Sequence, residues 1–383
     1  MESRLAVRYQ QIADPTVVKL LEITNQPGII SFAGGIPAPE TFPTELVADA
    51  TRGTPLNLQY SSTQGILELR ELVAGKLSRE WARQVNANEI LITSGSQQAL
   101  DLIGRTFLND DDTVLVEDPT YFVALYVLSA YGAKYQTVDW HKPRSLAGAK
   151  LAYVVSNYQN PTGETLTQVQ RQVIATMLGE AGTLLVEDDP YGELYFGRRP
   201  PRPIASIAPK QTIYVTSFSK IMAPAFRLGV VVAEATVIEK LARVKTGMDL
   251  CTSAMTQSIA LRVLQDPRYT EHLIKLRQYY GRKARVMLMA LKQYMPKGVA
   301  WTHPQGGMFV WVTLPACVDT AQLHERALGE KVAFVPGYIF RSSKEKSSSL
   351  RLSFATASGE EIERGIEILA SLVKQTLRGG ERK

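Results

Sequence analysis

The residues best suited to chemistry stand directly after four short apolar runs of the chain. They comprise a small turn rich in hydroxyl groups, an amide, an acid with a tyrosine three residues later, and a lysine preceded by two serines and followed by an arginine. In chain order they are Ser94–Gln98, Asn160, Asp188 with Tyr191, and Ser217–Lys220 with Arg227. Ligands of α/β sheets bind beyond the carboxyl ends of the strands, so we expect these side chains to lie together.

This set of residues matches the needs of one cofactor, pyridoxal phosphate. The cofactor requires an amine to hold its aldehyde, an anion near its pyridine nitrogen, donors for its phenolate oxygen and a cradle for its phosphate. The turn Ser94–Gln98 opens a helical stretch, whose free N–H groups and positive dipole end favour a phosphate. The spacing therefore indicates a pyridoxal-phosphate enzyme.

The elements that must position these residues can be read from the hydrophobic pattern. Continuous runs of Val, Ile and Leu are typical of strands that are covered on both faces. Such runs occupy residues 89–93, 113–117, 151–156, 183–187, 212–216 and 228–233. Amphipathic stretches separate them, which predicts an α/β fold with a mostly parallel sheet.

One of these amphipathic stretches carries a clear start signal for a helix. Thr167 and Gln170 form a capping-box pair. The apolar residues expected on one face of the helix are Leu166, Val169, Val173, Ile174, Met177 and Leu178.

The chain divides into three segments by the same pattern. Residues 1–44 are expected to form an N-terminal arm and linker that packs with the small domain, and residues 45–280 a large cofactor-binding domain. Residues 281–383 are expected to form a small α+β domain, and a long helix is expected through residues 269–291.

The composition argues against several classes of function. The 383 residues carry a net charge of +6, but acidic and basic residues alternate, so we expect no nucleic-acid partner. Two cysteines and four scattered histidines offer neither a disulfide framework nor a metal site. No two glycines are separated by a single residue, which excludes the dinucleotide fingerprint. No apolar run has the length of a membrane span, so we expect no membrane association and a cytoplasmic protein.

A series of motifs resembles the class I/II aminotransferases, which have the fold-type I architecture and use pyridoxal phosphate. Within this family the chain is similar to the branch of 2-aminoadipate (LysN-like) and kynurenine aminotransferases. The motifs, in the family's order, are SFAGGIPAP at 31–39, QYSSTQG at 59–65, TSGSQQ at 93–98, NPTG at 160–163, EDDPY at 187–191, SFSK at 217–220, PQGGMF at 304–309 and LRLSF at 350–354. The resemblance implies a large domain with a mostly parallel seven-stranded sheet between helices, and a smaller α+β domain.

The resemblance also implies which residues hold the cofactor. Lys220 is implied to form the Schiff base with it and then to move the proton from the substrate Cα. Asp188 is implied to pair with the pyridine nitrogen, which keeps the ring an electron sink. Asn160 and Tyr191 are implied to hydrogen-bond the phenolate oxygen. The remaining implied contacts are Tyr121, which stacks on the ring, and the phosphate ligands Ser96, Gln97, Ser217, Ser219 and Arg227.

Substrate and subunit contacts follow from the same resemblance. Arg351 is implied to bind the substrate α-carboxylate through a bidentate fork that lysine cannot copy, with Gly35 and Asn160 beside it. Tyr60 resembles the tyrosine that reaches the phosphate of the neighbouring subunit. The resemblance therefore implies a homodimer with shared active sites.

The expected reaction is a ping-pong transfer of an amino group from an L-amino acid to a 2-oxo acid, with 2-oxoglutarate as the expected acceptor. Relatives that act on 2-aminoadipate tend to carry an arginine in the N-terminal helix, where this chain has Val18 with Lys19 beside it. An apolar residue at that position favours aromatic or branched-chain substrates over strict specificity for 2-aminoadipate.

Two alternatives stay open. The first is a β-lyase or decarboxylase, because the same fold and cofactor support several reactions. The second is an effector-binding module, since this fold also follows a DNA-binding helix-turn-helix domain in one class of bacterial regulators. The arm begins close to Met1, so we expect no such domain here.

Overall fold

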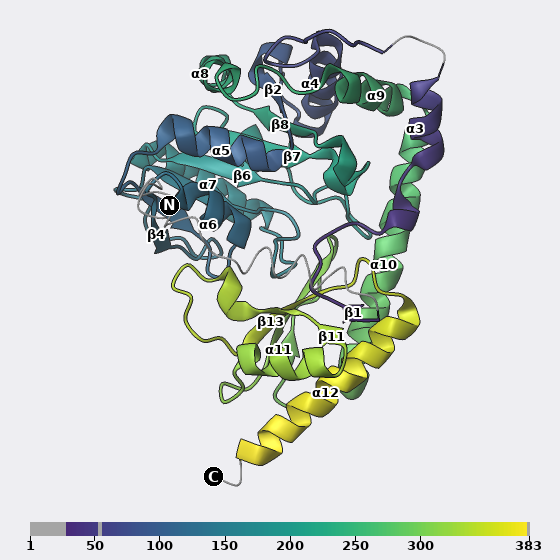
Figure 1. The fold of residues 1–383 in the computed structure, drawn as a ribbon. Helices are drawn as coiled ribbons and strands as arrows, with labels where there is room; N and C mark the ends of the chain where they lie inside the picture. Colours follow the sequence, from purple (N-terminus) through teal and green to yellow (C-terminus); the bar gives the residue numbers. More distant parts are fainter. Residues whose placement is uncertain (1–27, 53–55, 381–383) are drawn as a thin grey trace, which may run out of the picture.

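The computed structural model describes residues 28–52 and 56–380, and a seven-stranded sheet lies within its larger part, in the upper half of Figure 1. The strand order is β2-β8-β7-β6-β5-β3-β4. The strands are β2 (Ile90–Thr93), β3 (Thr113–Val116), β4 (Lys134–Thr137), β5 (Leu151–Val154), β6 (Leu184–Asp188), β7 (Thr212–Ser217) and β8 (Gly229–Val232). Strand β8 runs antiparallel to both of its neighbours, β2 and β7, and all the other neighbouring pairs in this sheet are parallel. The mostly parallel seven-stranded sheet expected from the sequence is therefore confirmed.

Helices connect and cover these strands. The α-helices of the described residues are α3 (Thr44–Thr51), α4 (Leu67–Trp81), α5 (Ser96–Phe107), α6 (Phe122–Ser129), α7 (Gln168–Ala181), α8 (Ala235–Thr246), α9 (Ala254–Gln265), α10 (Arg268–Tyr294), α11 (Thr320–Gly329) and α12 (Gly359–Gly380). Short 3-10 helices lie at η2 (Pro39–Thr41), η3 (Ala87–Glu89), η4 (Ile204–Ser206), η5 (Phe218–Lys220), η6 (Pro224–Phe226) and η7 (Gly337–Phe340).

The central strands are buried on both faces because their side chains alternate between two hydrophobic clusters. In β5, Leu151 and Tyr153 belong to the cluster that also contains buried residues of α5 and α6. Ala152 and Val154 belong to a second cluster, together with Ile174 of α7. A strand buried on both sides has a continuous apolar sequence, which is why the hydrophobic pattern predicted it. β4 was not predicted, because it is a largely exposed edge strand with polar residues.

Helix α7 corrects one expectation. Its capping box, Thr167 with Gln170, forms as predicted. Val169 and Val173, however, are 73% and 43% exposed, and Arg171 lies on the buried side of the helix instead. The guanidinium of Arg171 finds hydrogen-bond acceptors inside the protein, so a charged residue occupies a position that an apolar pattern does not reveal.

The C-terminal part contains a smaller sheet, to which the arm is attached. Its strands, in the order β12-β13-β10-β9, are β12 (Val335–Pro336), β13 (Ser349–Ser353), β10 (Phe309–Thr313) and β9 (Ala300–Trp301). In the arm, β1 (Ile30–Ser31) pairs in parallel with β11 (Val332–Ala333). The backbone N–H of Ser353 donates to Phe32 O at 2.8 Å, so the arm lies against the strand that carries Arg351.

Helix α10 runs from the region of α3 and α9 to the smaller sheet, where it packs against α12 (Figure 1). The boundary expected between residues 280 and 281 falls within this single helix. The division into domains at residues 44 and 280 stays a prediction.

No helix within residues 28–52 and 56–380 is both long and apolar enough to cross a membrane. The same ranges contain no group of three or more His, Cys, Asp and Glu residues placed to hold a metal ion.

Candidate active site

Lys220 lies at the end of η5, directly after the carboxyl end of β7. Its Nζ donates a hydrogen bond to the backbone oxygen of Gly35 in the arm, at 2.8 Å. Burial lowers the pKa of Lys220 to about 8, and the positive charges of Arg351 and Arg227 act in the same direction. An amine with such a pKa is partly neutral near physiological pH, and only a neutral amine can attack an aldehyde.

Asp188 ends β6, on the neighbouring strand of the sheet. Its Oδ2 accepts a hydrogen bond from the hydroxyl of Tyr153 at 2.8 Å. Its Oδ1 is buried and has no hydrogen-bond partner among the described residues. Burial raises the pKa of Asp188 to about 7, although the Tyr153 hydrogen bond opposes the shift. This carboxylate can therefore accept one further hydrogen bond from a positively charged N–H group.

Three polar side chains lie close to Asp188 and Arg351. Tyr191 lies near Asn160, and burial, with smaller effects of nearby charges, raises the pKa of Tyr191 well above the usual value. Burial also raises the pKa of Tyr121, and the charges of Asp188 and Arg351 both act on it. Both tyrosines are therefore neutral hydroxyl donors at physiological pH.

The turn Ser94–Gln98 leads from β2 into α5, with Gly95 at φ +86° as the helix N-cap. A Cβ at Gly95 would lie 2.7 Å from Nη2 of Arg227, so this glycine allows the guanidinium to approach the turn. A Cβ at Gly229 would likewise lie 2.7 Å from the backbone nitrogen of Ser96. The first N–H groups of a helix and a guanidinium thus meet at one place, which suits a phosphate.

Ser217 and Ser219, the two serines before Lys220, are both buried. The Ser217 hydroxyl donates to that of Ser219 at 2.9 Å and also contacts Leu228 O at 3.3 Å. The backbone N–H of Ser219 donates to Ser217 Oγ at 3.1 Å. These bonds fix the loop that carries Lys220.

Arg351, on β13, is 3% exposed. Its Nη1 donates to Asn160 Oδ1 at 2.7 Å and its Nη2 donates to the backbone oxygen of Ala33. The guanidinium carbon lies 4.5 Å from the ring centroid of Phe309 and 5.0 Å from that of Phe340. Burial lowers the pKa of Arg351 to about 10, so the side chain remains a cation at neutral pH.

The structure therefore brings together most of the residues selected from the sequence. Lys220, Asp188, Asn160, Tyr191, Tyr121, Arg227, Arg351 and Gly35 are linked by the contacts and charge effects described above, and Ser96 lies at the adjoining turn. Gln97 is exposed at the start of α5. Tyr60 is 75% exposed, on the segment before α4. Val18 and Lys19, considered for substrate choice, lie outside the described residues.

Sequence reasoning missed three residues that shape this site. Tyr153 is the hydrogen-bond partner of Asp188, and Phe309 and Phe340 flank the guanidinium of Arg351. Tyr153 stands within an apolar run, where a buried hydroxyl needs a partner, so its presence there was a usable signal. Phe309 ends a family motif at the start of β10, and Phe340 lies in η7, but neither position indicated a contact with Arg351, because a buried aromatic residue is usually part of a core.

These residues fit pyridoxal phosphate. Asp188 has a buried oxygen without a partner among the described residues, as an anion next to a pyridine nitrogen requires. The glycine at the turn leaves room that a side chain would fill, next to Arg227. The Lys220 amine lies in the same cluster, with the lowered pKa that an attack on an aldehyde requires.

Comparison with protein families agrees with this fit. The family model described as aminotransferase class I and II matches residues 30–369. The chain belongs to the class I and II aminotransferases. The aromatic-amino-acid aminotransferase 1 of Thermococcus litoralis is 36% identical in sequence to this aminotransferase. The match covers 94% of this chain and 91% of the chain from Thermococcus litoralis.

Two crystal structures are similar to this aminotransferase over nearly all of its length. The kynurenine aminotransferase of Pyrococcus horikoshii, in complex with PMP, has a TM-score of 0.93 and 36% identity and covers 98% of both chains. LysN, the α-aminoadipate aminotransferase of Thermus thermophilus, complexed with N-(5'-phosphopyridoxyl)-L-leucine, has a TM-score of 0.89 and 36% identity, over 98% of this chain and 99% of that one.

The predictions about family, fold and chemistry are thereby confirmed. This aminotransferase has the fold-type I architecture, and its cofactor is pyridoxal phosphate. It is an enzyme that transfers amino groups between amino acids and 2-oxo acids.

Proposed function

We propose that Lys220 is the catalytic residue that holds the cofactor and moves the substrate proton. When bound, pyridoxal phosphate supplies an electron sink for the bonds at the substrate Cα. The Lys220 amine takes the proton from that carbon at its Nζ and would deliver it to the C4′ carbon of the cofactor, as the transfer of an amino group requires. Asp188 holds a proton on the pyridine nitrogen, since its unpaired Oδ1 can accept that N–H.

The other side chains bind and orient. Arg351 binds the substrate α-carboxylate, next to Asn160 and the backbone of Gly35. Asn160 and Tyr191 hold the phenolate oxygen of the cofactor, and Tyr121 covers its ring. The phosphate is held by Ser96, Gln97, Ser217, Ser219 and Arg227.

One observation carries this proposal. The Lys220 amine and the Arg351 guanidinium converge on the arm, where Lys220 bonds to Gly35 O and Arg351 bonds to Ala33 O. A group that abstracts a proton from Cα must lie near the group that holds the carboxylate on the same carbon. Lys220 follows β7 of the large sheet and Arg351 lies on β13 of the smaller one, so the two residues reach the arm from different parts of the protein.

The preferred donors in this proposal are aromatic and branched-chain L-amino acids, with 2-oxoglutarate as the acceptor. The apolar Val18 in the N-terminal stretch supports this choice over strict use of 2-aminoadipate. The relative from Thermococcus litoralis bears the name of an aromatic-amino-acid aminotransferase, and the LysN structure contains a leucine adduct.

We further propose a homodimer in which Tyr60 reaches the phosphate of the partner subunit. Tyr60 is 75% exposed and Leu58 beside it is 84% exposed, as residues of an interface would be in a single subunit.

The proposed location of the enzyme is the cytoplasm. Cys251 and Cys317 are free thiols, which supports a location in this reducing compartment.

The test is an amino-acid panel incubated with 2-oxoglutarate and the purified holoenzyme. Transamination yields equal amounts of the new 2-oxo acid and of glutamate. Ammonia, pyruvate or carbon dioxide without glutamate would instead indicate a β-lyase or decarboxylase. A preference for 2-aminoadipate over phenylalanine and leucine would overturn the proposed substrate class.

Lys220→Met tests the assignment of the catalytic residue. Activity should fall by at least about 10²–10⁴-fold, the usual contribution of a general acid–base group. Borohydride reduction of the wild-type holoenzyme, followed by peptide mapping, should place the cofactor adduct on Lys220. Lys240→Met, at an exposed lysine of α8, is the matched control and should keep full activity. An adduct on any other lysine would refute the assignment.

A further inference from the structure

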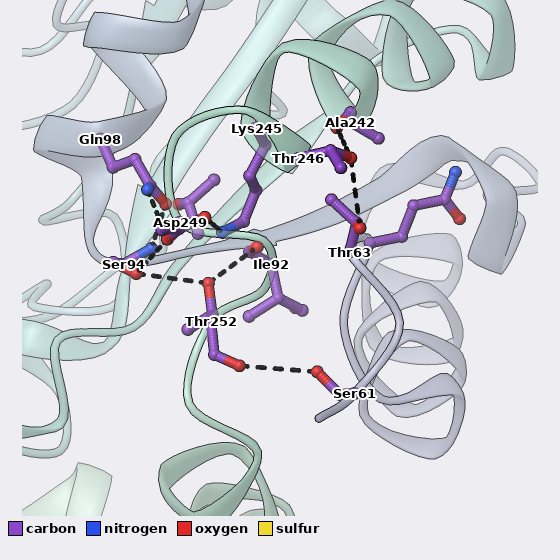
Figure 2. Close-up of polar contacts among 12 residues, drawn as sticks. Ser61, Thr63, Ile92, Ser94, Gln98, Ala242, Lys245, Thr246, Asp249 and Thr252 are labelled. Carbon is purple, nitrogen blue, oxygen red and sulfur yellow. Dashed lines mark hydrogen bonds and ion pairs between the residues drawn. The ribbon is translucent and has the colours of Figure 1, made fainter. Parts of the chain in front are cut away.

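A polar cluster behind the turn Ser94–Gln98 has no place in the catalytic machinery described above. Figure 2 shows Asp249 at its centre, with Ser94, Gln98 and Lys245 around it. Asp249 Oδ2 accepts hydrogen bonds from Gln98 Nε2 at 2.6 Å and from Ser94 Oγ at 3.1 Å. Asp249 Oδ1 accepts one from Lys245 Nζ at 2.5 Å.

These bonds close a ring around the turn. Besides donating to Asp249, the side chain of Gln98 accepts the backbone N–H of Ser94 at 2.7 Å. Ser94 and Gln98 stand on either side of Gly95 and Ser96, the residues at the N-terminus of α5. Asp249 therefore fixes both ends of the segment whose N–H groups are free to bind an anion.

A second set of bonds ties this ring to the rest of the large sheet. Thr252 Oγ1 donates to the backbone oxygen of Ile92 in β2, at 3.3 Å, and lies 3.4 Å from Ser94 Oγ (Figure 2). Asp249 and Thr252 belong to one loop, so the loop touches the strand before the turn and the turn itself. It can thus hold the turn in a fixed relation to the strand.

The charge of Asp249 is maintained by its partners. Burial would raise the pKa of Asp249, but the hydrogen bonds from Lys245 and Gln98 lower it overall. The Lys245 side chain is fully buried, whereas that of Asp249 is 28% exposed. Hydrogen bonds to an ionised acceptor are stronger than those to a neutral one, so the charge matters for holding the turn.

We propose that Asp249, supported by Lys245, is a positioning residue for the phosphate-binding turn of this aminotransferase. It touches neither substrate nor cofactor, and it acts by holding Ser94 and Gln98 so that the N–H groups between them face the phosphate. This inference rests on the proposed phosphate site at Ser96 and Arg227.

The test compares two ligands that differ only in the phosphate. Dissociation constants of the apoenzyme for pyridoxal phosphate and for pyridoxal are measured by the change in protein fluorescence. Asp249→Asn should weaken the binding of pyridoxal phosphate by about tenfold or more, as the loss of charged hydrogen bonds predicts, and leave that of pyridoxal nearly unchanged. The ³¹P resonance of the bound phosphate should shift in the same variant.

Matched variants make the outcome decisive. Glu271→Gln breaks an exposed ion pair with Lys275 of the same i,i+4 spacing and should leave both constants unchanged. Equal weakening of both ligands by Asp249→Asn, or weakening of neither, would overturn the proposal. If Asp249→Asn unfolds, Ser94→Ala removes one of the bonds to Asp249 and should weaken the binding of pyridoxal phosphate selectively, by a smaller factor. If neither variant weakens pyridoxal phosphate selectively, the proposal is also overturned.

Arg227→Met and Ser96→Ala separate this inference from the proposed site. If neither changes the preference for pyridoxal phosphate over pyridoxal, the phosphate site is assigned wrongly and the inference falls with it. If both reduce that preference and Asp249→Asn does not, only the role of Asp249 is refuted.

Discussion

Two buried arginines of this enzyme, Arg171 and Arg351, interact with their surroundings in opposite ways. Arg171, on α7, is fully buried, and Arg351, on β13 in the active site, is 3% exposed. The five hydrogen bonds of Arg171 run from Nε to Leu166 O (3.0 Å), from Nη1 to Pro201 O (3.2 Å) and Arg202 O (3.3 Å), and from Nη2 to Ser156 O (2.9 Å) and Asn157 Oδ1 (2.6 Å). Arg351 bonds to Asn160 and Ala33, and its Nε has no partner in the described part of the chain.

The difference separates a structural cation from one that can bind a ligand. A guanidinium has five N–H donors, and each one left unpaired in the interior costs free energy. Arg171 uses all five on the protein, whereas Arg351 keeps donors that no residue in the described ranges accepts. Burial alone therefore does not identify a functional arginine. A buried arginine whose N–H donors are only partly paired is the one that can bind a ligand.

Replacing Arg171 should produce the largest loss of stability. Glu187 lies 3.9 Å from Arg171 Nη1, and both side chains are fully buried. Arg171→Met leaves this carboxylate without its cation, so the free energy of unfolding of the apoenzyme should fall by about 3–5 kcal/mol in urea denaturation. The KM for the amino acid should stay unchanged in the fraction that folds. A raised KM with normal stability would contradict the structural role.

Replacing Arg351 should mainly affect substrate binding. Arg351→Met removes the proposed carboxylate ligand, so kcat/KM for the amino acid should fall by the equivalent of about 2–5 kcal/mol, measured by steady-state kinetics. Arg351→Lys should not restore activity, because a lysine lacks the fork. The melting temperature of the apoenzyme should change less than in Arg171→Met. The reverse pattern would make Arg351 the structural residue of the two.

Sequence reasoning could predict Arg351 but not Arg171, and the reason is physical. Arg351 stands in a motif of the family, and the strands that lead to Lys220 and Asp188 are continuous apolar runs. The apolar pattern of the helix that carries Arg171 predicts that Val169 and Val173 face inward, so a buried Arg171 is not expected. The acceptors of Arg171 are backbone oxygens that only folding brings together. Contacts between distant segments that depend on backbone atoms leave no pattern in the sequence.

The same limit applies to the polar cluster behind the phosphate turn. Asp249 contacts Ser94 and Gln98, which lie more than 150 residues earlier in the chain. Its spacing from Lys245 suggests an ordinary helix-surface pair. The turn itself could be predicted, because small residues before a helix are a local signal. The residue that positions it could be found only in the structure.

The pH dependence of cofactor capture sharpens the comparison between the two arginines. The pKa of Lys220 is lowered to about 8 by burial and by the charge of Arg351, among others. The neutral amine is the reactive form, so the rate at which apoenzyme captures pyridoxal phosphate should rise with pH and level off above pH 8, measured by stopped-flow absorbance. Arg351→Met should shift this midpoint to higher pH, whereas Arg171→Met should leave it in place. Equal midpoints in all three proteins would show that Arg351 exerts no charge effect on Lys220.

Two adjacent acids of β6, Glu187 and Asp188, extend the comparison and should give the smallest effects. Glu187 accepts the backbone N–H groups of Ile204 at 3.0 Å and Ala205 at 2.9 Å, whereas Asp188 Oδ1 has no partner in the ranges that the structure covers. The folded state raises the pKa of Asp188 from 3.8 to about 7. At pH values between these two pKa values, the Asp188 carboxyl binds more protons in the folded state than in the unfolded state. Its ionisation therefore makes the apoenzyme less stable as pH rises from 4 to 7.

Asp188→Asn removes that cost, because the amide does not ionise. The melting temperature of the apoenzyme should therefore rise by a few degrees at pH 8, and the gain should shrink toward pH 4, measured by differential scanning calorimetry. Glu187→Gln should lower the melting temperature, since the amide replaces one of the oxygens that accept the two backbone N–H groups. A destabilised Asp188→Asn would mean that Asp188 supports the fold as Glu187 does, and its unpaired oxygen would then be no sign of function.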